Sequence, residues 1–154
     1  MLDLESVIAS RSISAEIVDY HMPLPTVELA AQAAGVAPDM IIKTLILHDG
    51  NGRYIAVVLA GDQRLDFDKV QSRMGVKKLK FASHAEVLRV TGYPAGGTPP
   101  FGFAQPIPTL CDDSVMRQPI VLGGGGRPEL LVRVSPSALV AVAQATVGDF
   151  ARRG

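Results

Sequence analysis

The segment most informative about the fold covers residues 40–61 and has the sequence MIIKTLILHDGNGRYIAVVLAG. Two apolar runs rich in β-branched residues, 40–48 and 53–61, are typical of β-strands. Between them, DGNG at 49–52 has the composition of a tight hairpin turn. The sequence therefore predicts a β-hairpin over this segment.

Short helices and further strands are predicted on both sides of the hairpin. The expected helices cover 3–11, 27–35, 67–75, 85–92 and 136–145, and the last four follow the capping residues Thr26, Asp66, Ser83 and Ser135. The expected further strands cover 15–20, 78–82, 106–111, 118–123 and 129–134. This mixture predicts an α+β fold in which short helices surround a mixed, strongly curved, barrel-like β-sheet.

Length and composition predict a single domain over residues 1–154. Fifteen acidic residues balance 15 lysines and arginines, so the chain has no general attraction for nucleic acid and any RNA contact must be local. One basic cluster, formed by Lys77, Lys78 and Lys80 with Arg73 nearby, is either a solvated face or a contact for the phosphates of an RNA end.

Several common site types are not expected. The single cysteine, Cys111, excludes an internal disulfide and is predicted to be a small buried strand residue, while Asp112 is predicted to have a turn or capping role. The three histidines lie far apart in the sequence, so neither a metal nor a cofactor is expected. The start of the chain does not resemble a secretory signal, and no apolar run is long enough to span a membrane. We therefore expect a cytoplasmic protein without a membrane partner.

Lys43 is the first candidate functional residue, because it shares a strand face with apolar residues such as Leu45 and Leu47. A lysine in such a row is costly to bury without a partner. Either its long side chain reaches solvent at the strand end, or the amine has a function.

Two glycine-rich segments are the other candidates. The loop over 92–102 combines glycines, which let a ligand approach the backbone, with prolines that stiffen the chain. It is either a rigid surface turn or a set of backbone donors for a carbonyl or ribose oxygen. The four glycines at 123–126 lack the Lys-Ser/Thr of a phosphate-binding loop, so they form either a flexible hairpin turn or a pocket wall.

An ordered series of motifs resembles the YbaK/ProX family of tRNA-editing domains over about residues 26–147. The segments that carry the resemblance are Thr26-Val27-Glu28, Ile42-Lys43-Thr44-Leu45, Gly61-Asp62 with Leu65-Asp66, Thr91-Gly92-Tyr93, Gly96-Gly97, Pro100-Phe101-Gly102, Pro108-Thr109 with Asp112, Gly126, and Val134-Ser135-Pro136 before Leu139. Several members of that family carry a polar residue such as His after the Pro-Phe-Gly step, where this chain has Phe103. The departure leaves the choice of substrate open.

The resemblance implies a trans-editing aminoacyl-tRNA deacylase, a metal-independent ester hydrolase acting on mischarged tRNA. The expected substrate is tRNA(Pro) carrying a small amino acid such as Ala or Cys. The implied catalytic residues are Lys43 and Gly96, and the implied substrate-binding residues are Thr44, Gly97, Thr98, Pro100, Gly102, Gly124, Gly125 and Gly126. The implied partners are the acceptor end of aminoacyl-tRNA and prolyl-tRNA synthetase, and the chain is expected to be a monomer or a weak homodimer.

The resemblance also suggests how such a reaction proceeds. Because no side chain is an obvious strong base, a ribose hydroxyl of the substrate would help to activate the attacking water. Lys43 would bind the phosphate, ribose or carbonyl end, and the glycine segments would hold the aminoacyl group. The alternatives are a noncatalytic module that binds aminoacyl-adenosine or another nucleotide, and a partner protein of a synthetase.

Overall fold

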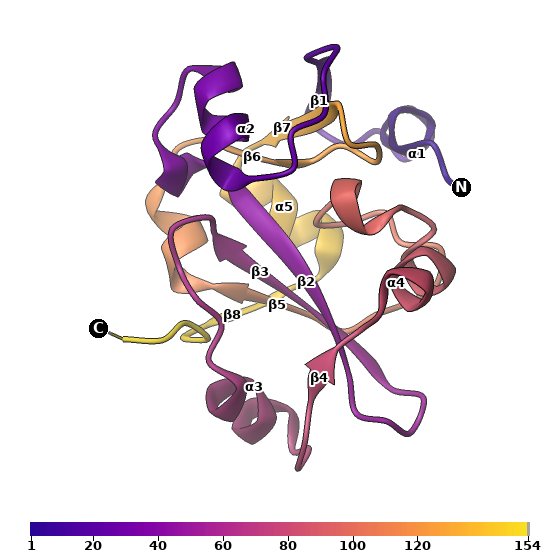
Figure 1. Cartoon of the computed structure of the whole chain (residues 1–154), viewed down its shortest axis with the longest axis vertical. Helices are drawn as coiled ribbons and strands as arrows, with labels where there is room; N and C mark the ends of the chain where they lie inside the picture. Colours follow the sequence, from indigo (N-terminus) through magenta and orange to yellow (C-terminus); the bar gives the residue numbers. More distant parts are fainter. Residues whose placement is uncertain (154) are drawn as a thin grey trace.

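Two β-sheets with short helices around them make up the structure, a computed structural model that describes residues 1–153 (Figure 1). The elements, in chain order, are α1 (Leu4–Ser10), β1 (Ala15–Asp19), α2 (Val27–Ala34), η1 (Pro38–Met40), β2 (Ile42–His48), β3 (Tyr54–Ala60), α3 (Phe67–Met74), β4 (Lys80–Phe81), α4 (His84–Thr91), η2 (Ala95–Gly97), β5 (Thr109–Asp112), η3 (Asp113–Arg117), β6 (Val121–Gly124), β7 (Leu130–Val134), α5 (Pro136–Ala143) and β8 (Thr146–Gly148). The predicted α+β class is confirmed.

The predicted hairpin is the centre of the larger sheet. Strands β2 and β3 pair antiparallel, with Ile42 opposite Ala60 and His48 opposite Tyr54. The five strands have the order β4-β2-β3-β5-β8, in which β3–β5 and β5–β8 are parallel and the other pairs antiparallel. The sheet is therefore mixed, as predicted. Strand β8 was not predicted, because three residues are too few to show a periodic pattern.

The smaller sheet has the order β1-β7-β6 and is antiparallel throughout. A single parallel bridge between Ile41 and Leu122 connects it to the start of β2. Among residues 1–153 the strand pairings thus give two open sheets, and the barrel-like closure expected from the sequence is not confirmed. No further bridge joins β2 to β6 within residues 1–153, and the candidate site lies between these two strands.

Capping residues fix the helix boundaries much as the sequence predicts. The side chains of Thr26, Asp66 and Ser135 each accept a hydrogen bond from a backbone N–H in the first turn of the helix that follows. Ser83 forms a complete capping box with Glu86. Helices α2, α3 and α4 each end at a glycine in the left-handed region. None of the helices described in 1–153 has the length and apolar character that a membrane crossing requires.

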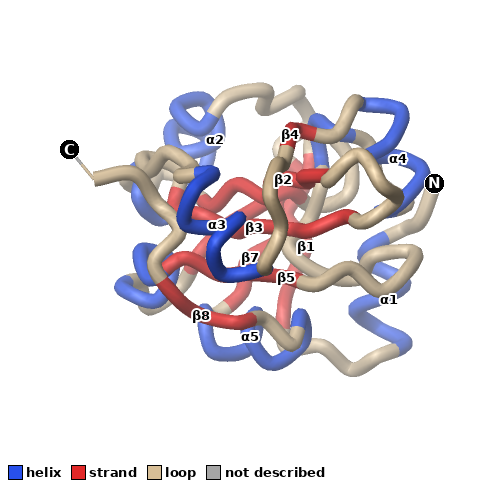
Figure 2. The backbone as a smooth tube through the Cα atoms, turned by 90° about the horizontal axis from the view of Figure 1, so that it is seen from below, coloured by secondary structure: helices blue, strands red, loops and turns tan. Residues whose placement is uncertain are grey.

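Helices cover both faces of the five-stranded sheet, and Figure 2 shows helical segments around the strands on several sides. On one face, Leu47 of β2 belongs to the same buried cluster as Val70 of α3. On the other face, Ile46 packs in a cluster with Val87 and Val90 of α4. Lys43 lies on the α3 face, because odd-numbered residues of β2 share one side of the strand.

Candidate active site

A pocket of about 210 Å³ opens between β2 and β6, just beyond the Ile41–Leu122 bridge. Its walls come from the start of β2, the segment leading into α2, the η2 turn and the end of β6. The lining residues are 24–27, 30, 41–45, 95–98, 123, 124, 128, 130 and 131. No Asp, Glu, His or Cys is among them, so the lining offers one charged group, the amine of Lys43.

The backbone of Thr44 faces this pocket. The Gly61 N–H donates to the Ile41 carbonyl, and the Asp49 N–H donates to the Arg53 carbonyl. Since hydrogen-bonded pairs alternate in an antiparallel ladder, odd-numbered residues of β2 turn their N–H and C=O groups toward β3. Thr44 is even-numbered, so its N–H and C=O point the other way, into the gap between β2 and β6. The pocket thus has a donor and an acceptor fixed by a strand.

Lys43 is half-buried at one side of the pocket, in a row with Leu45 and Leu47. Its Nζ donates to the carbonyl oxygen of Gly61 over 3.4 Å. Burial is the main cause that lowers the pKa of Lys43 below its usual value, and the nearby carboxylate of Asp62 opposes this effect. Within residues 1–153 no carboxylate lies within ion-pair distance of the amine. The side chain is therefore a partly desolvated cation available to an anionic or polar ligand.

The two glycine-rich segments pack against each other, backbone on backbone. A Cβ atom on Gly97 would lie 2.7 Å from the backbone of Arg127, and one on Gly124 would collide with the carbonyl of Thr98. The Gly126 N–H also donates to the Gly97 carbonyl over 2.8 Å. Glycine is required here by close approach, so the two segments form one rigid wall and not a flexible turn.

Gly96 is different from these neighbours. It is exposed, and a Cβ atom added to it would meet only Pro128, at 3.9 Å. Packing within the protein therefore does not require a glycine at this position. The open space above Gly96 belongs to the pocket and is available to a ligand.

A family comparison agrees with this arrangement. The model of the "Aminoacyl-tRNA editing domain" family matches residues 21–142, which include every residue named above as lining the pocket. The chain belongs to the aminoacyl-tRNA editing domain family. The resemblance inferred from the sequence motifs is thereby confirmed.

Relatives of this editing domain include free-standing proteins and parts of synthetases. An uncharacterized protein of Bacillus subtilis, YwhH, is 31% identical, and the match covers 80% of this chain and 78% of YwhH. EbsC of Enterococcus faecalis, a candidate Cys-tRNA(Pro)/Cys-tRNA(Cys) deacylase, is 26% identical over 80% of this chain and 74% of its own. The proline–tRNA ligase of Trichlorobacter lovleyi is 29% identical over 64% of this chain, which corresponds to 17% of the ligase.

A solved structure shares the whole fold of this editing domain. It is that of a candidate trans-editing enzyme for prolyl-tRNA synthetase, and it matches with a TM-score of 0.90 and 30% sequence identity. The match covers 98% of this chain and 96% of the other. The overall fold observed here is therefore shared with a related solved structure.

Six of the residues predicted for the site come together in the pocket of this editing domain. They are Lys43, Thr44, Gly96, Gly97, Thr98 and Gly124. Among them, Gly97 has its N–H and C=O engaged by Pro94 and Gly126, and the Thr98 hydroxyl donates to Pro94. These two residues therefore shape the wall, while Lys43, Thr44 and Gly96 present groups or space to a ligand.

Four predicted site residues lie outside the pocket lining. Gly125 and Gly126 border a different hollow, and their N–H groups donate to Leu130 and Gly97. Gly102, whose carbonyl accepts from the Tyr93 hydroxyl, borders a third hollow of about 480 Å³. Pro100 is buried. Gly126 therefore supports the wall through its hydrogen bond to Gly97, whereas Gly102 lies against Leu4 and Val7 of α1.

Phe103 also lies in the third hollow and not in the Lys43 pocket. The departure from the family pattern noted at this position therefore does not change the lining of the Lys43 pocket.

Two other expectations concern residues of strand β5. Cys111 is fully buried in β5, where burial raises its pKa to about 12, and the buried Asp112 accepts from the backbone N–H of Ser114.

The entry to α2 contributes a part of the wall that was not predicted from the sequence. Residues 24–27 line the pocket, as does Pro128 of the β6–β7 turn. The Thr26-Val27 pair belongs to the series of family motifs, so a signal was present in the sequence. Its place in the pocket depends on how α2 lies over β2, which no local pattern specifies (Figure 1).

Proposed function

We propose that this chain is a trans-editing aminoacyl-tRNA deacylase, which hydrolyses the ester between an amino acid and the terminal adenosine of mischarged tRNA. The observation that carries the proposal is the pocket itself, where the Lys43 amine, the Thr44 backbone and the open space at Gly96 meet. Membership of the editing-domain family supports the reaction class. EbsC and the trans-editing candidate related to prolyl-tRNA synthetase support it further.

The size of the pocket supports a small aminoacyl group as the part that enters. At about 210 Å³ it lies below the range of roughly 300–1,000 Å³ that is usual for drug-sized ligands. Side chains such as Val27, Ile42 and Leu131 give it apolar walls. We therefore propose tRNA(Pro) carrying Ala or Cys as the substrate, with larger side chains excluded by size. The proline–tRNA ligase and EbsC relatives favour the same tRNA.

The proposed mechanism assigns the attack to a water molecule. Its oxygen adds to the ester carbonyl carbon, and the carbonyl oxygen becomes negative. The bond between that carbon and the ribose oxygen then breaks, the ribose oxygen takes up the proton that the water has lost, and the amino acid is released. The Thr44 N–H and the Lys43 amine, which both belong to residues of the pocket lining, would stabilise the oxyanion or hold the ribose end. The lining contains no carboxylate or imidazole that could act as the base. As the family resemblance implies, a ribose hydroxyl of the substrate would help to activate the water.

We also propose that the reaction needs no metal. The pocket lining lacks the carboxylate, imidazole and thiolate groups that hold zinc or magnesium. No group of three or more such side chains in metal-binding arrangement occurs among the described residues. Deacylation should therefore be unchanged by a chelator such as EDTA. Inhibition by EDTA that added metal reverses would contradict the proposal.

A panel of mischarged tRNAs tests the function. We expect the chain to release Ala or Cys from tRNA(Pro) much faster than the spontaneous rate, and to leave esters of large residues such as Phe intact. Binding of the same substrates is measured in parallel. Saturable binding without loss of the ester would indicate a noncatalytic module, and neither binding nor hydrolysis would indicate a partner protein of the synthetase.

A further inference from the structure

A further hollow, separate from the three already described, lies beside the Gly61–Asp62 turn that Lys43 contacts. It has a volume of about 640 Å³ and is lined by Asp62, Gln63, Arg64, Arg152 and Arg153. The first three of these residues belong to the connection between β3 and α3, and the other two to the C-terminal segment. In Figure 1 the yellow C-terminal segment crosses this connection. Three arginines from distant parts of the sequence thus surround one concave surface.

Backbone contacts hold the two segments together. The Arg152 N–H donates to the Arg64 carbonyl over 2.8 Å, and Leu65 forms an antiparallel bridge with Ala151. From α3, Lys69 Nζ donates to the Ala151 carbonyl over 2.7 Å and forms an ion pair with Asp149. The arginine side chains therefore extend, exposed, from a fixed backbone.

The hollow has an excess of positive charge. Three arginines and one carboxylate, Asp62, line it. Arg153 forms an exposed ion pair with Asp149 at 3.4 Å, whereas neither Arg64 nor Arg152 has an ion-pair partner within residues 1–153. Arginine is well suited to phosphate, because its planar group can donate two parallel hydrogen bonds.

The hollow lies next to the candidate active site, and one turn of the chain links the two. Lys43 donates to the carbonyl of Gly61, and the hollow begins at the next residue, Asp62. Arg64 is close enough to Lys43 to contribute to the lowering of its pKa. A row of cations therefore runs from Lys43 through Arg64 to Arg152.

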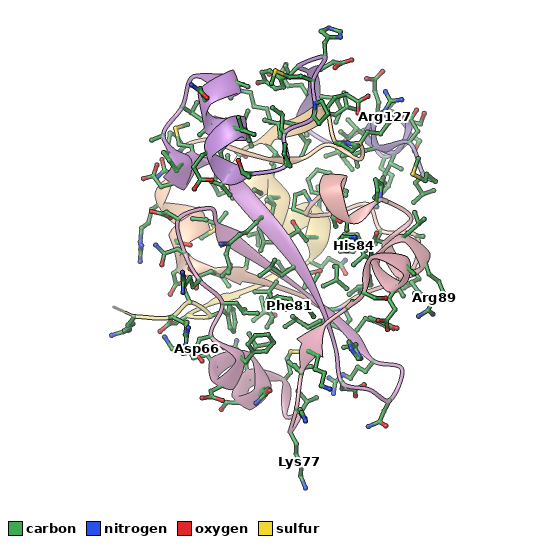
Figure 3. All side chains as sticks on the ribbon, viewed as in Figure 1. Asp66, Lys77, Phe81, His84, Arg89 and Arg127 are labelled. Atoms are coloured by element: carbon green, nitrogen blue, oxygen red, sulfur yellow. The ribbon has the colours of Figure 1, made fainter. Side chains whose placement is uncertain are left out.

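The basic cluster noted in the sequence lies at the other end of β2. Lys80 is paired with His48, five positions beyond Lys43, which corresponds to roughly 17 Å along a strand. Figure 3 shows Lys77 pointing outward at the lower end of the molecule. Lys77, Lys78 and Lys80 are all exposed. They form a solvated face, away from the pocket.

We infer that Arg64, Arg152 and Arg153 bind the phosphates of the unpaired nucleotides that precede the terminal adenosine of the substrate. This inference rests on the proposed function, because it takes the aminoacyl group to lie in the Lys43 pocket. The RNA strand then leaves the pocket past Lys43 and the Gly61–Asp62 turn and enters the arginine-lined hollow.

The test compares two substrates and two double variants. The substrates are full mischarged tRNA and an aminoacyl-adenosine without phosphates. The variants are Arg64→Gln with Arg152→Gln, and as a matched control Lys77→Gln with Lys78→Gln. We expect the arginine variant to lose roughly tenfold or more in kcat/KM on tRNA and nothing on aminoacyl-adenosine. Each single-strand phosphate that the variant no longer neutralises should make the log–log salt slope shallower by about 0.7. The lysine variant should match the unaltered protein on both substrates.

Binding gives a readout that does not depend on hydrolysis. Affinity for an uncharged acceptor-stem minihelix with its unpaired end should fall in the arginine variant, and affinity for a blunt minihelix should not. Thermal unfolding checks that the exposed glutamines leave the fold intact, and Arg64→Lys with Arg152→Lys should restore part of the affinity. Equal kcat/KM on tRNA for the arginine variant and the unaltered protein, or an equal decrease in both double variants, would overturn the inference. If the unaltered protein hydrolyses neither substrate, the proposed function itself fails.

Discussion

At the scale of single residues, Lys43 is the side chain on which the proposed chemistry depends. The strand alternation that gives it an apolar row also places its amine beside the pocket, on the Gly61 carbonyl. A buried cation usually has a carboxylate partner, and none lies within ion-pair distance among the described residues. The half-desolvated amine is therefore ready to interact with the substrate.

Replacing Lys43 by alanine should leave the fold intact and lower deacylation strongly. One charge-assisted contact contributes about 1.5–3 kcal/mol, which corresponds to roughly ten- to a hundredfold in rate if the contact is made in the transition state. Single-turnover hydrolysis of mischarged tRNA(Pro) measures the effect, with Lys77→Ala as a control at the far end of β2. A folded Lys43→Ala protein with the original rate would show that the amine has no role.

The pH dependence of kcat/KM should reveal the role of Lys43 as well. Burial lowers the pKa of Lys43, so its ammonium form is lost at a lower pH than that of an exposed lysine. If the charged form is needed, kcat/KM corrected for spontaneous ester hydrolysis should be highest below this pKa and fall as the pH rises through it. In Lys43→Arg, which stays charged, this alkaline fall should disappear. A fall that persists unchanged in the arginine variant would assign it to another group.

At the scale of elements, the two glycine segments act as one wall. Gly97 contacts the backbone of Arg127, and Gly124 contacts that of Thr98, so η2 and the end of β6 hold each other in place. The same wall ends at Gly96, where no neighbouring atom of the protein would clash with a side chain. One chemical change, the addition of a methyl group, should therefore have opposite consequences at two positions of this wall.

Gly124→Ala should destabilise the protein by roughly 1–3 kcal/mol, because the new methyl group collides with the Thr98 carbonyl and the wall must shift. Gly96→Ala should leave the melting temperature nearly unchanged but lower deacylation, because its methyl group occupies space used by the substrate. Thermal unfolding and single-turnover rates of the two variants separate the effects. Full activity in Gly96→Ala would mean that the substrate does not approach this residue.

At the scale of the whole molecule, charge limits how RNA can bind. The formal net charge is zero, so affinity for the tRNA body should be weak, and binding should be concentrated at the acceptor end. We expect an aminoacylated acceptor-stem minihelix to be deacylated about as well as full tRNA, with a shallow salt dependence that reflects a few phosphates. Rates and affinities of both substrates across a salt series measure this. A minihelix that is neither bound nor hydrolysed while full tRNA is would contradict the model.

Local patterns in the sequence were enough to specify most of the helices and strands of this protein and the residues worth testing, although not the three-residue strand β8. The hairpin at 40–61, the caps at Thr26, Asp66, Ser83 and Ser135, and the prominence of Lys43 all follow from such patterns, because periodicity, capping and turn chemistry act over a few residues. The ordered motifs likewise indicated the family that the comparison confirmed.

The way these parts combine into a site is a property of the folded chain alone. The presence of two sheets, the single bridge between β2 and β6, and the contribution of α2 to the pocket lining all depend on contacts between residues far apart in the sequence. The arginine-lined hollow is a further example, since residues 64 and 152 meet only when the C-terminal segment pairs with the β3–α3 connection. Such contacts leave no local pattern, because their energy comes from burial and pairing that arise only when the whole chain is folded.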